Sequence, residues 1–202
     1  NSVVESIASR IKVCILNQGV WNARKPHKNE THEEIARHGL DAKDAEVYVR
    51  LTKHESYTKA LAIKGRIYNE HKRLTMSSPC EGMRVVPTGR EFEHSANISN
   101  LFSEFNKHVD LFILDYDNVI ELAKRKFNLL FDQSMFPPKE IIRKKFYNQI
   151  RYMSAPVSGE WGDWIMETAE ICKIELQDRI VSAAKKLIET CGNDGKLYSS
   201  VL

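Results

Sequence analysis

The sequence lacks the short motifs that mark common catalytic and cofactor sites. No two of its four cysteines have the CxxC spacing, and there is no Gly-x-Ser-x-Gly segment. Their wide spacing disfavours a disulfide scaffold and a zinc ribbon. Residues 192–196 contain two glycines and a lysine but lack the spacing and the preceding strand of a phosphate-binding loop. We therefore predict no catalytic residue and no cofactor, and expect a protein without enzymatic activity.

The chain also lacks long apolar runs and a strong charge of one sign. No run approaches the roughly 20 apolar residues that a membrane-spanning helix needs. Of the 202 residues, 42% are hydrophobic and 28% are charged, and the formal net charge is only +3. These values are typical of a globular protein. We expect one domain over residues 1–202, with no membrane association.

The strongest positive signal is a stripe of apolar residues at steps of three and four, which predicts a long helix over 91–131. A second stripe of this kind predicts a helix over 160–191. Such coiled-coil-like spacing keeps one helix face against an apolar partner. Weaker patterns predict helices over 43–74, 3–16 and 31–38. The first two stripes comprise Ile98, Phe102, Phe105, Val109, Phe112, Tyr116, Val119, Ala123, Phe127 and Leu130, then Trp161, Ile165, Ala169, Cys172, Leu176, Ile180, Ala183, Leu187 and Cys191.

Strand content is expected to be small. Residues 83–86 and 148–154 read as two short strands that could pair into one two-stranded ribbon. With their neighbours, at 83–88 and 136–156, they would form a small cap. The predicted fold class is mainly α, built from long antiparallel amphipathic helices in a hairpin or bundle that carries this cap.

Several pieces of the sequence resemble, in order, a family of uncharacterised proteins encoded by tailed bacteriophages. Residues 21–25 (WNARK) resemble the family's W-x-A-R-K, and residues 82–87 (GMRVVP) resemble its G-x-R-[IVL]-[IVL]-P. The other matching pieces are His38-Gly39, residues 41–45, the stripe Phe105, Val109, Phe112 and Tyr116, then Phe136-Pro137-Pro138 and Phe146.

The resemblance covers roughly residues 10–164. It departs at 68–79, where the family has a stretch rich in tyrosine and histidine that ends in Leu-Pro-Trp. The family has no established activity. The resemblance therefore implies a phage protein that works in the cytoplasm of the bacterial host, and it implies nothing about chemistry.

Clusters of possible metal ligands do not have the spacing that a metal site needs. His32 begins a segment like a metalloprotease helix, but the position four residues later is Ala36, and His38 lies on the opposite side. His27, Glu33 and Glu34 lie nearby without a spacing that makes them converge. Asp110, Asp115 and Asp117 form another set, but Asp115 and Asp117 stand two apart on a predicted helix and point about 200° away from each other, so they cannot hold one metal together. We predict no metal site.

A basic segment supports one of two functional hypotheses. Residues 124–151 contain eight basic and two acidic residues, with Phe146 and Tyr147 among them. Basic and aromatic side chains together suit a nucleic acid, since they pair with phosphates and stack on bases. The alternative interpretation is a solvated helix face beside core aromatics. The candidate nucleic-acid-binding residues are Lys139, Arg143, Lys144 and Arg151.

The other hypothesis is binding of a protein partner, and it is the function we favour. The long amphipathic helices exceed what a catalytic pocket would require. Trp161 and Trp164 open the last predicted helix, where an exposed tryptophan can anchor a protein contact or serve as a structural staple. A long stripe also needs a long partner, so we expect a homodimer with Phe102, Phe105 and Val109 nearest the contact. The alternative function is a nucleic-acid-binding accessory protein.

Overall fold

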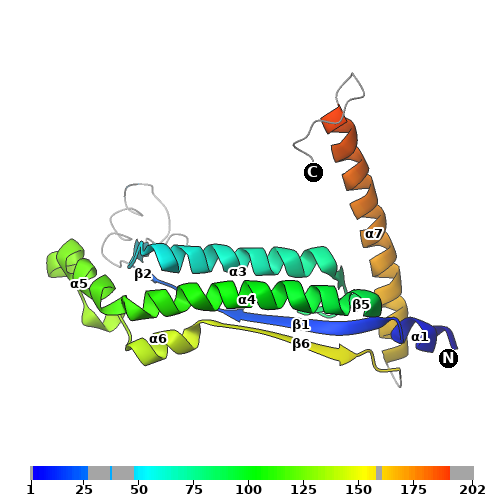
Figure 1. Ribbon diagram of the computed structural model, residues 1–202, viewed down its shortest axis with the longest axis horizontal. Coiled ribbons are helices and arrows are strands. Elements are labelled where there is room, and N and C mark those ends of the chain that lie inside the picture. The colour runs from blue at the N-terminus through cyan, green and yellow to red at the C-terminus, as the bar shows by residue number, and fades with distance from the viewer. Residues whose placement is uncertain (1, 27–36, 38–47, 158–160, 192–202) are drawn as a thin grey trace. The chain divides into compact units, whose positions relative to one another are not determined.

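The computed structural model describes residues 2–26, 37, 48–157 and 161–191 (Figure 1). Helices account for 66% of the described residues, which confirms the prediction of a mainly α protein. The elements are, in order, α1 (Ser2–Ala8), β1 (Ile11–Gly19), β2 (Arg24–Pro26), β3 (Tyr48–Arg50), α3 (Glu55–Leu74), β4 (Met76–Ser77), β5 (Met83–Pro87), α4 (Glu91–Leu114), α5 (Tyr116–Phe127), α6 (Lys139–Lys145), β6 (Tyr147–Ser154) and α7 (Trp161–Cys191).

Several predicted elements coincide with observed ones. α7 covers the helix predicted at 160–191, and β5 and β6 coincide with the two predicted strands. Apart from Arg37, the helix predicted at 31–38 lies outside the described residues, as does the beginning of the helix predicted at 43–74.

The predicted two-stranded ribbon is wrong, because the sheet that contains β5 and β6 has four strands. Its order is β4-β5-β1-β6, so β1 lies between the two strands that were expected to pair. β1 runs antiparallel to β5, with Val13 opposite Val85 and Cys14 opposite Arg84. A separate pair, β2 with β3, is also antiparallel.

The sheet is larger because the helix predicted over 3–16 ends early. α1 stops at Ala8, and β1 begins at Ile11. The residues at the start of β1 fit either structure by spacing, but Ile11, Val13 and Ile15 are β-branched and alternate with other residues. Such side chains pack well on a pleated sheet and lose rotamer freedom in a helix. Pairing with β5 therefore decides this segment.

The helix predicted over 91–131 is divided in two. α4 ends at Leu114 and α5 begins at Tyr116, with Asp115 between them at φ −92° and ψ 7°. The Asp115 carboxylate lies 3.1 Å from Nε2 of His54 and accepts a hydrogen bond from the side-chain Nδ2 of Asn118 at 2.6 Å. These side-chain bonds hold the chain where the helix changes direction.

The helix predicted over 43–74 begins later, at Glu55. Thr52 Oγ1 accepts a hydrogen bond from the His54 amide, and His54 Nδ1 accepts one from the Ser56 amide. Bonds of this kind satisfy amides that have no partner in the first turn of a helix. The residues just before them form β3 rather than helix.

Two compact units make up the chain: unit 1 (residues 1–16, 70–96 and 150–202) and unit 2 (residues 17–69 and 97–149). Their boundaries fall inside β1, α3, α4 and β6. The core of unit 1 gathers side chains from α1, the sheet and α7. Its buried members are Ala8, Val13, Val85, Ala155, Trp164 and Ile165.

The core of unit 2 is aromatic. The Trp21 ring lies 6.1 Å from the ring of Phe112 and 5.9 Å from that of Tyr116, measured between centroids. The Tyr57 hydroxyl donates to the Trp21 carbonyl at 3.0 Å and accepts from the Ala23 amide at 3.3 Å. Trp21 and Ala23, the first and third residues of the WNARK segment, are thus core residues.

Candidate interaction surface on α7

The first half of α7 is anchored in unit 1 by apolar contacts. Trp164 and Ile165 are buried in its core cluster, and Cys172, about two turns after Ile165, packs against that cluster. Ile165 and Cys172 belong to the apolar stripe that the sequence shows in this helix. Their packing against the cluster explains why the first half of α7 is fixed to α1 and the sheet.

A cluster of ion pairs and hydrogen bonds fixes the middle of α7. Glu175 accepts hydrogen bonds from the Ser77 amide at 2.7 Å, from Arg84 at 3.2 Å and from Arg179 at 2.6 Å. Burial by itself raises the pKa of Glu175, but the Ser77 amide and the two arginines outweigh it and lower the pKa. The carboxylate is therefore ionised, and it links α7 to β4 and β5.

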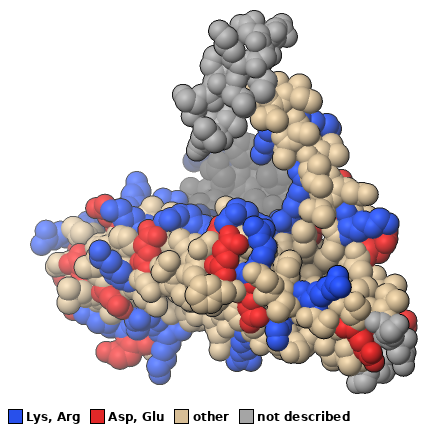
Figure 2. Space-filling model, turned by 45° about the vertical axis from the view of Figure 1, so that its right-hand side comes forward, with Lys and Arg blue, Asp and Glu red and all other residues tan. Residues whose placement is uncertain are grey.

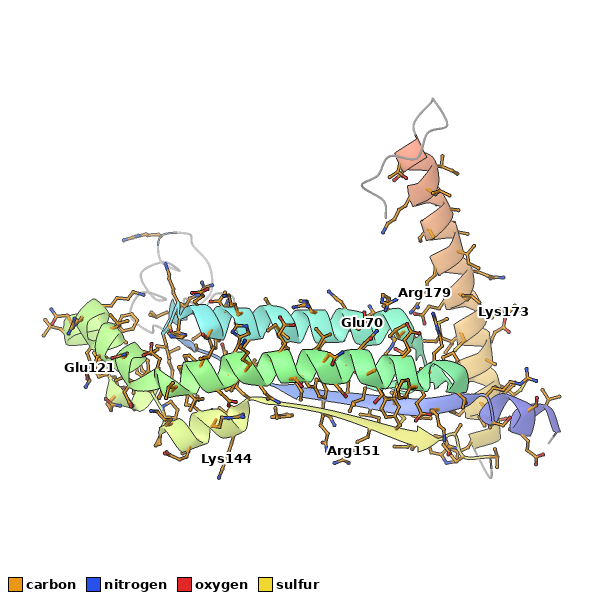
Figure 3. The ribbon with its side chains drawn as sticks, in the orientation of Figure 1. Glu70, Glu121, Lys144, Arg151, Lys173 and Arg179 are labelled. Carbon is orange, nitrogen blue, oxygen red and sulfur yellow. The ribbon has the colours of Figure 1, made fainter. Side chains whose placement is uncertain are left out.

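Arg179 also caps α3. Its guanidinium donates to the carbonyls of Arg73 at 2.9 Å, Lys72 at 2.7 Å and Thr75 at 2.7 Å. Figure 3 shows Arg179 beside the carboxyl end of α3, whereas Lys173 points away from it. The last carbonyls of a helix lack partners within the helix and carry partial negative charge, so a guanidinium suits this place.

Beyond Arg179, α7 has no cover within the described residues. Every residue from Ile180 to Glu189 is exposed. In Figure 2 the surface of α7 is predominantly uncharged. Six aliphatic side chains of α7 are between 48% and 73% exposed, and we name them the α7 apolar face: Ile174, Leu176, Ile180, Val181, Leu187 and Ile188.

The α7 apolar face occupies one side of the helix. At about 100° per residue, its six members fall within an arc of roughly 160°. Ile174, Val181 and Ile188 stand seven residues apart and form one line along the helix, beside the stripe that contains Leu176 and Ile180. Only the stripe is predicted from the three- and four-residue steps of the sequence. The additional line of Ile174, Val181 and Ile188 is visible in the sequence, and it indicates that the apolar arc is wider than contact with one core requires.

The partner-binding residues predicted from the sequence lie mostly in the interior. Phe105 and Val109 on α4 are fully buried in unit 2, and Phe102 is partly buried, so the dimer contact predicted at these residues is not supported. Trp164 is 7% exposed and belongs to the core of unit 1. Trp161 is 38% exposed and meets the Trp164 ring edge-on at 5.5 Å, as a structural staple does.

Two of the four candidate nucleic-acid-binding residues of the basic segment at 124–151 pair with the chain's own carboxylates. Lys139 pairs with Asp117 at 2.9 Å, and Arg143 pairs with Asp110 at 3.1 Å. Figure 3 shows Lys144 pointing away from α6. Phe146 is buried in the aromatic core of unit 2 and is not available to stack on a base.

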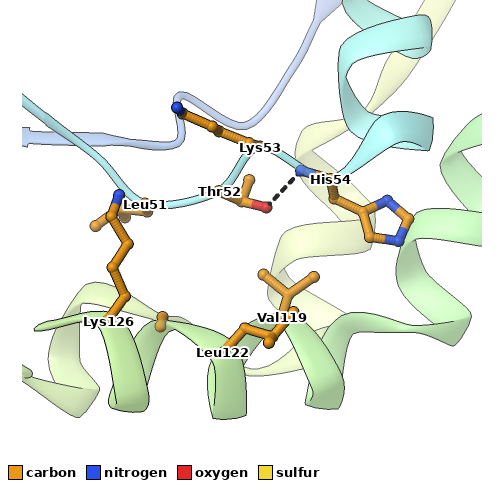
Figure 4. Close-up of a pocket in the computed structure, with 8 residues that line it drawn as sticks. Leu51, Thr52, Lys53, His54, Val119, Leu122 and Lys126 are labelled. Atoms are coloured by element: carbon orange, nitrogen blue, oxygen red, sulfur yellow. Dashed lines mark hydrogen bonds between the residues drawn. The ribbon is translucent and has the colours of Figure 1, made fainter. Parts of the chain in front are cut away.

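A pocket of about 440 Å³ opens in unit 2 between α5 and the segment before α3 (Figure 4). Leu51, Val119 and Ala123 form its buried apolar floor, and Lys53 and Lys126 stand at its edge. Thr52 and His54 are engaged with each other through the bond that starts α3. The pocket thus has apolar walls without a set of polar groups directed at one point.

Unit 1 contains a buried chain of polar side chains. His71 Nδ1 lies 3.1 Å from His94 Nε2, and His94 Nδ1 lies 2.8 Å from the Tyr152 hydroxyl. Burial, with the charges of His94 and Arg84, lowers the pKa of His71 to about 4, and burial lowers that of His94. Burial raises the pKa of Tyr152 to about 12. These neutral groups join α3, α4 and β6.

Among the described residues, no group of three or more His, Cys, Asp or Glu side chains is placed to hold a metal ion. The histidine-rich segment that contains His32 and His38 lies outside those residues. None of the described helices is both long and apolar enough to cross a membrane. Comparisons with protein-family models, with curated proteins and with solved structures gave no match.

Proposed function

We propose that this protein acts by binding a protein partner through the α7 apolar face, without enzymatic activity of its own. The observation that carries the proposal is the contrast within α7. The helix is fixed as far as Arg179 by contacts of Trp164, Ile165 and Arg179, whereas the part beyond Arg179 presents exposed aliphatic side chains on one side. An apolar surface on a firmly held helix suits recognition of a partner helix, since little conformational freedom is lost on binding.

The resemblance to the tailed-phage family indicates where this function would be carried out. A phage-encoded protein without a catalytic centre would act in the cytoplasm of the infected bacterium, by attaching to a protein present there. We infer this setting from the sequence resemblance alone.

Site-specific photo-crosslinking tests the proposal. A photoreactive amino acid is placed at Ile180 or at Leu187 in the full chain, which is expressed in bacterial cells and irradiated there. The matched control carries the same group at Leu122, which is 63% exposed on α5 in unit 2. We expect a crosslinked protein adduct from Ile180 and Leu187 and none from Leu122. Adducts of equal yield from all three positions, or none from α7, would contradict the proposal.

The nucleic-acid hypothesis has less support, because Lys139 and Arg143 already pair with carboxylates of the same chain. It predicts DNA binding that weakens steeply as salt rises and that disappears when Lys139, Arg143, Lys144 and Arg151 are changed to glutamate. Titration of single- and double-stranded DNA at several salt concentrations distinguishes the two functions. We expect no such salt-dependent binding at micromolar protein.

A further inference from the structure

The size of the α7 apolar face indicates how large its partner surface must be. At about 100 Å² for each of six half-exposed side chains, it presents on the order of 600 Å² of aliphatic surface, the upper limit for an ordinary monomer. A stable interface buries about 800 Å² on each partner. One face of similar size, with the residues at its margins, is therefore enough to cover it.

The margins of the face are unlike each other. Relative to the line of Ile174, Val181 and Ile188, one margin is apolar and contains Ile180 and Leu187. The other margin is charged and contains Asp178 and Lys185, which form no ion pair within the described residues. Asp178 precedes Lys185 by seven residues, two turns of helix.

Two copies of this helix fit together in only one direction. When two helices pair antiparallel about a two-fold axis, each margin faces the same margin of the partner. Apolar then meets apolar, and an axis near Val181 and Ser182 brings each Asp178 opposite the other copy's Lys185. A parallel pair would place the charged margin against the apolar one and would desolvate charges without partners.

We propose that the occupant of the α7 apolar face is a second copy of this chain, bound with the two α7 helices antiparallel. This inference rests on the proposed function and names its partner. The Asp178 and Lys185 pairs set the direction, and the aliphatic side chains supply the stabilising contact. The homodimer is thus formed by α7, and Phe105 and Val109 of α4 take no part in it.

Light scattering on the purified full chain tests the proposal by mass. We expect twice the chain mass of 23.3 kDa at tens of micromolar protein, and the single-chain mass for Val181→Lys. The matched control is Leu122→Lys, which adds the same charge at an exposed leucine on α5 and should leave the dimer intact. A dimer that persists in Val181→Lys would overturn the proposal.

A charge exchange tests the direction of the pairing. Asp178→Lys should weaken the dimer by about fivefold or more, because lysines then oppose each other at two places. Asp178→Lys combined with Lys185→Asp should restore the parent dissociation constant. A double variant as weak as the single one would overturn the antiparallel arrangement.

The remaining outcomes separate this inference from the proposed function. A monomer in solution, together with photo-crosslinking of Ile180 to a different protein, overturns self-association and leaves the proposed function standing. A monomer without any crosslink overturns both. If residues 192–202 of the same chain cover the face, the full chain is a monomer and a chain ending at Cys191 dimerises, which also overturns the proposal. Equal dimerisation of both chains supports it.

Discussion

His71 and His94 lie end to end in the interior of unit 1, and their burial has a consequence at acidic pH. A histidine whose pKa is lower in the folded than in the unfolded protein favours the unfolded state as it becomes protonated there. The pKa of His71 falls from 6.5 to about 4 on folding. The stability that the buried neutral imidazole of His71 contributes is therefore complete above pH 6.5, and it is lost as the pH falls toward 4. His94 acts in the same direction.

Urea unfolding between pH 7 and pH 5 measures this effect. From His71 alone we expect the free energy of unfolding to fall by about 2 kcal/mol over this range. His71→Asn keeps a polar group beside His94 but does not titrate, so its free energy should depend less steeply on pH. Equal slopes for the variant and the parent would show that His71 does not titrate in this way.

Two glycines should respond in opposite ways to replacement by alanine. A Cβ atom at Gly19 in β1 would meet the ring of Tyr147 on β6, whereas one at Gly65 on α3 meets nothing. We expect Gly19→Ala to lower the free energy of unfolding by about 1 kcal/mol, because the ring must move. Gly65→Ala should raise it by about 0.5–1 kcal/mol, since alanine favours helix.

Thermal unfolding of the two variants, with Tyr147→Ala as background, checks this pair of predictions. In that background the ring is absent, and Gly19→Ala should no longer destabilise the protein. A loss of similar size with and without the ring would place the cause in the backbone of β1.

The element whose attachment matters most to the proposed function is α7. Arg179→Gln removes the guanidinium that caps the end of α3 and pairs with Glu175, and we expect it to lower the free energy of unfolding by about 1–2 kcal/mol. Lys173→Gln is the matched control on the same helix. Among the described residues Lys173 pairs with Glu170 alone, and both side chains are 62% exposed, so its loss should cost less than about 0.5 kcal/mol.

Chemical denaturation of both variants measures the difference. Hydrogen exchange adds a local readout, since the amides at the end of α3 and in the middle of α7 should lose protection in Arg179→Gln. Equal stability of the two variants would mean that the cap contributes little.

For the whole molecule, the division into two units makes a prediction about cooperativity. The boundaries between the units fall inside β1, α3, α4 and β6, so melting one unit alone would break four continuous elements. We expect a single unfolding transition, with equal calorimetric and van't Hoff enthalpies. Two resolved transitions in a calorimetric scan of the full chain would contradict this expectation. In a dimer, the midpoint temperature should also rise with protein concentration.

The candidate surface was only partly predictable from the sequence. The spacing of Leu176, Ile180 and Leu187 predicts an apolar stripe, but it does not indicate which element covers that stripe. Phe105 and Val109 were expected at a dimer contact because their spacing shows an apolar face. Spacing alone cannot tell whether such a face meets the chain's own core, as theirs does with the aromatic residues of unit 2, or is left exposed.

Local patterns in the sequence are enough to predict the mainly α character, the extent of α7 and the strands β5 and β6, because periods of about 3.6 and 2 residues are local properties of the chain. The assignment of residues 11–19 to β1 depends on tertiary contacts, because pairing with β5 outweighs an equally possible helical spacing. Tertiary contacts also decided the change of direction at Asp115, which depends on His54 from a distant part of the chain. The exposure of the α7 apolar face was decided in the same way, because burial depends on which elements meet, and spacing within one element does not specify them.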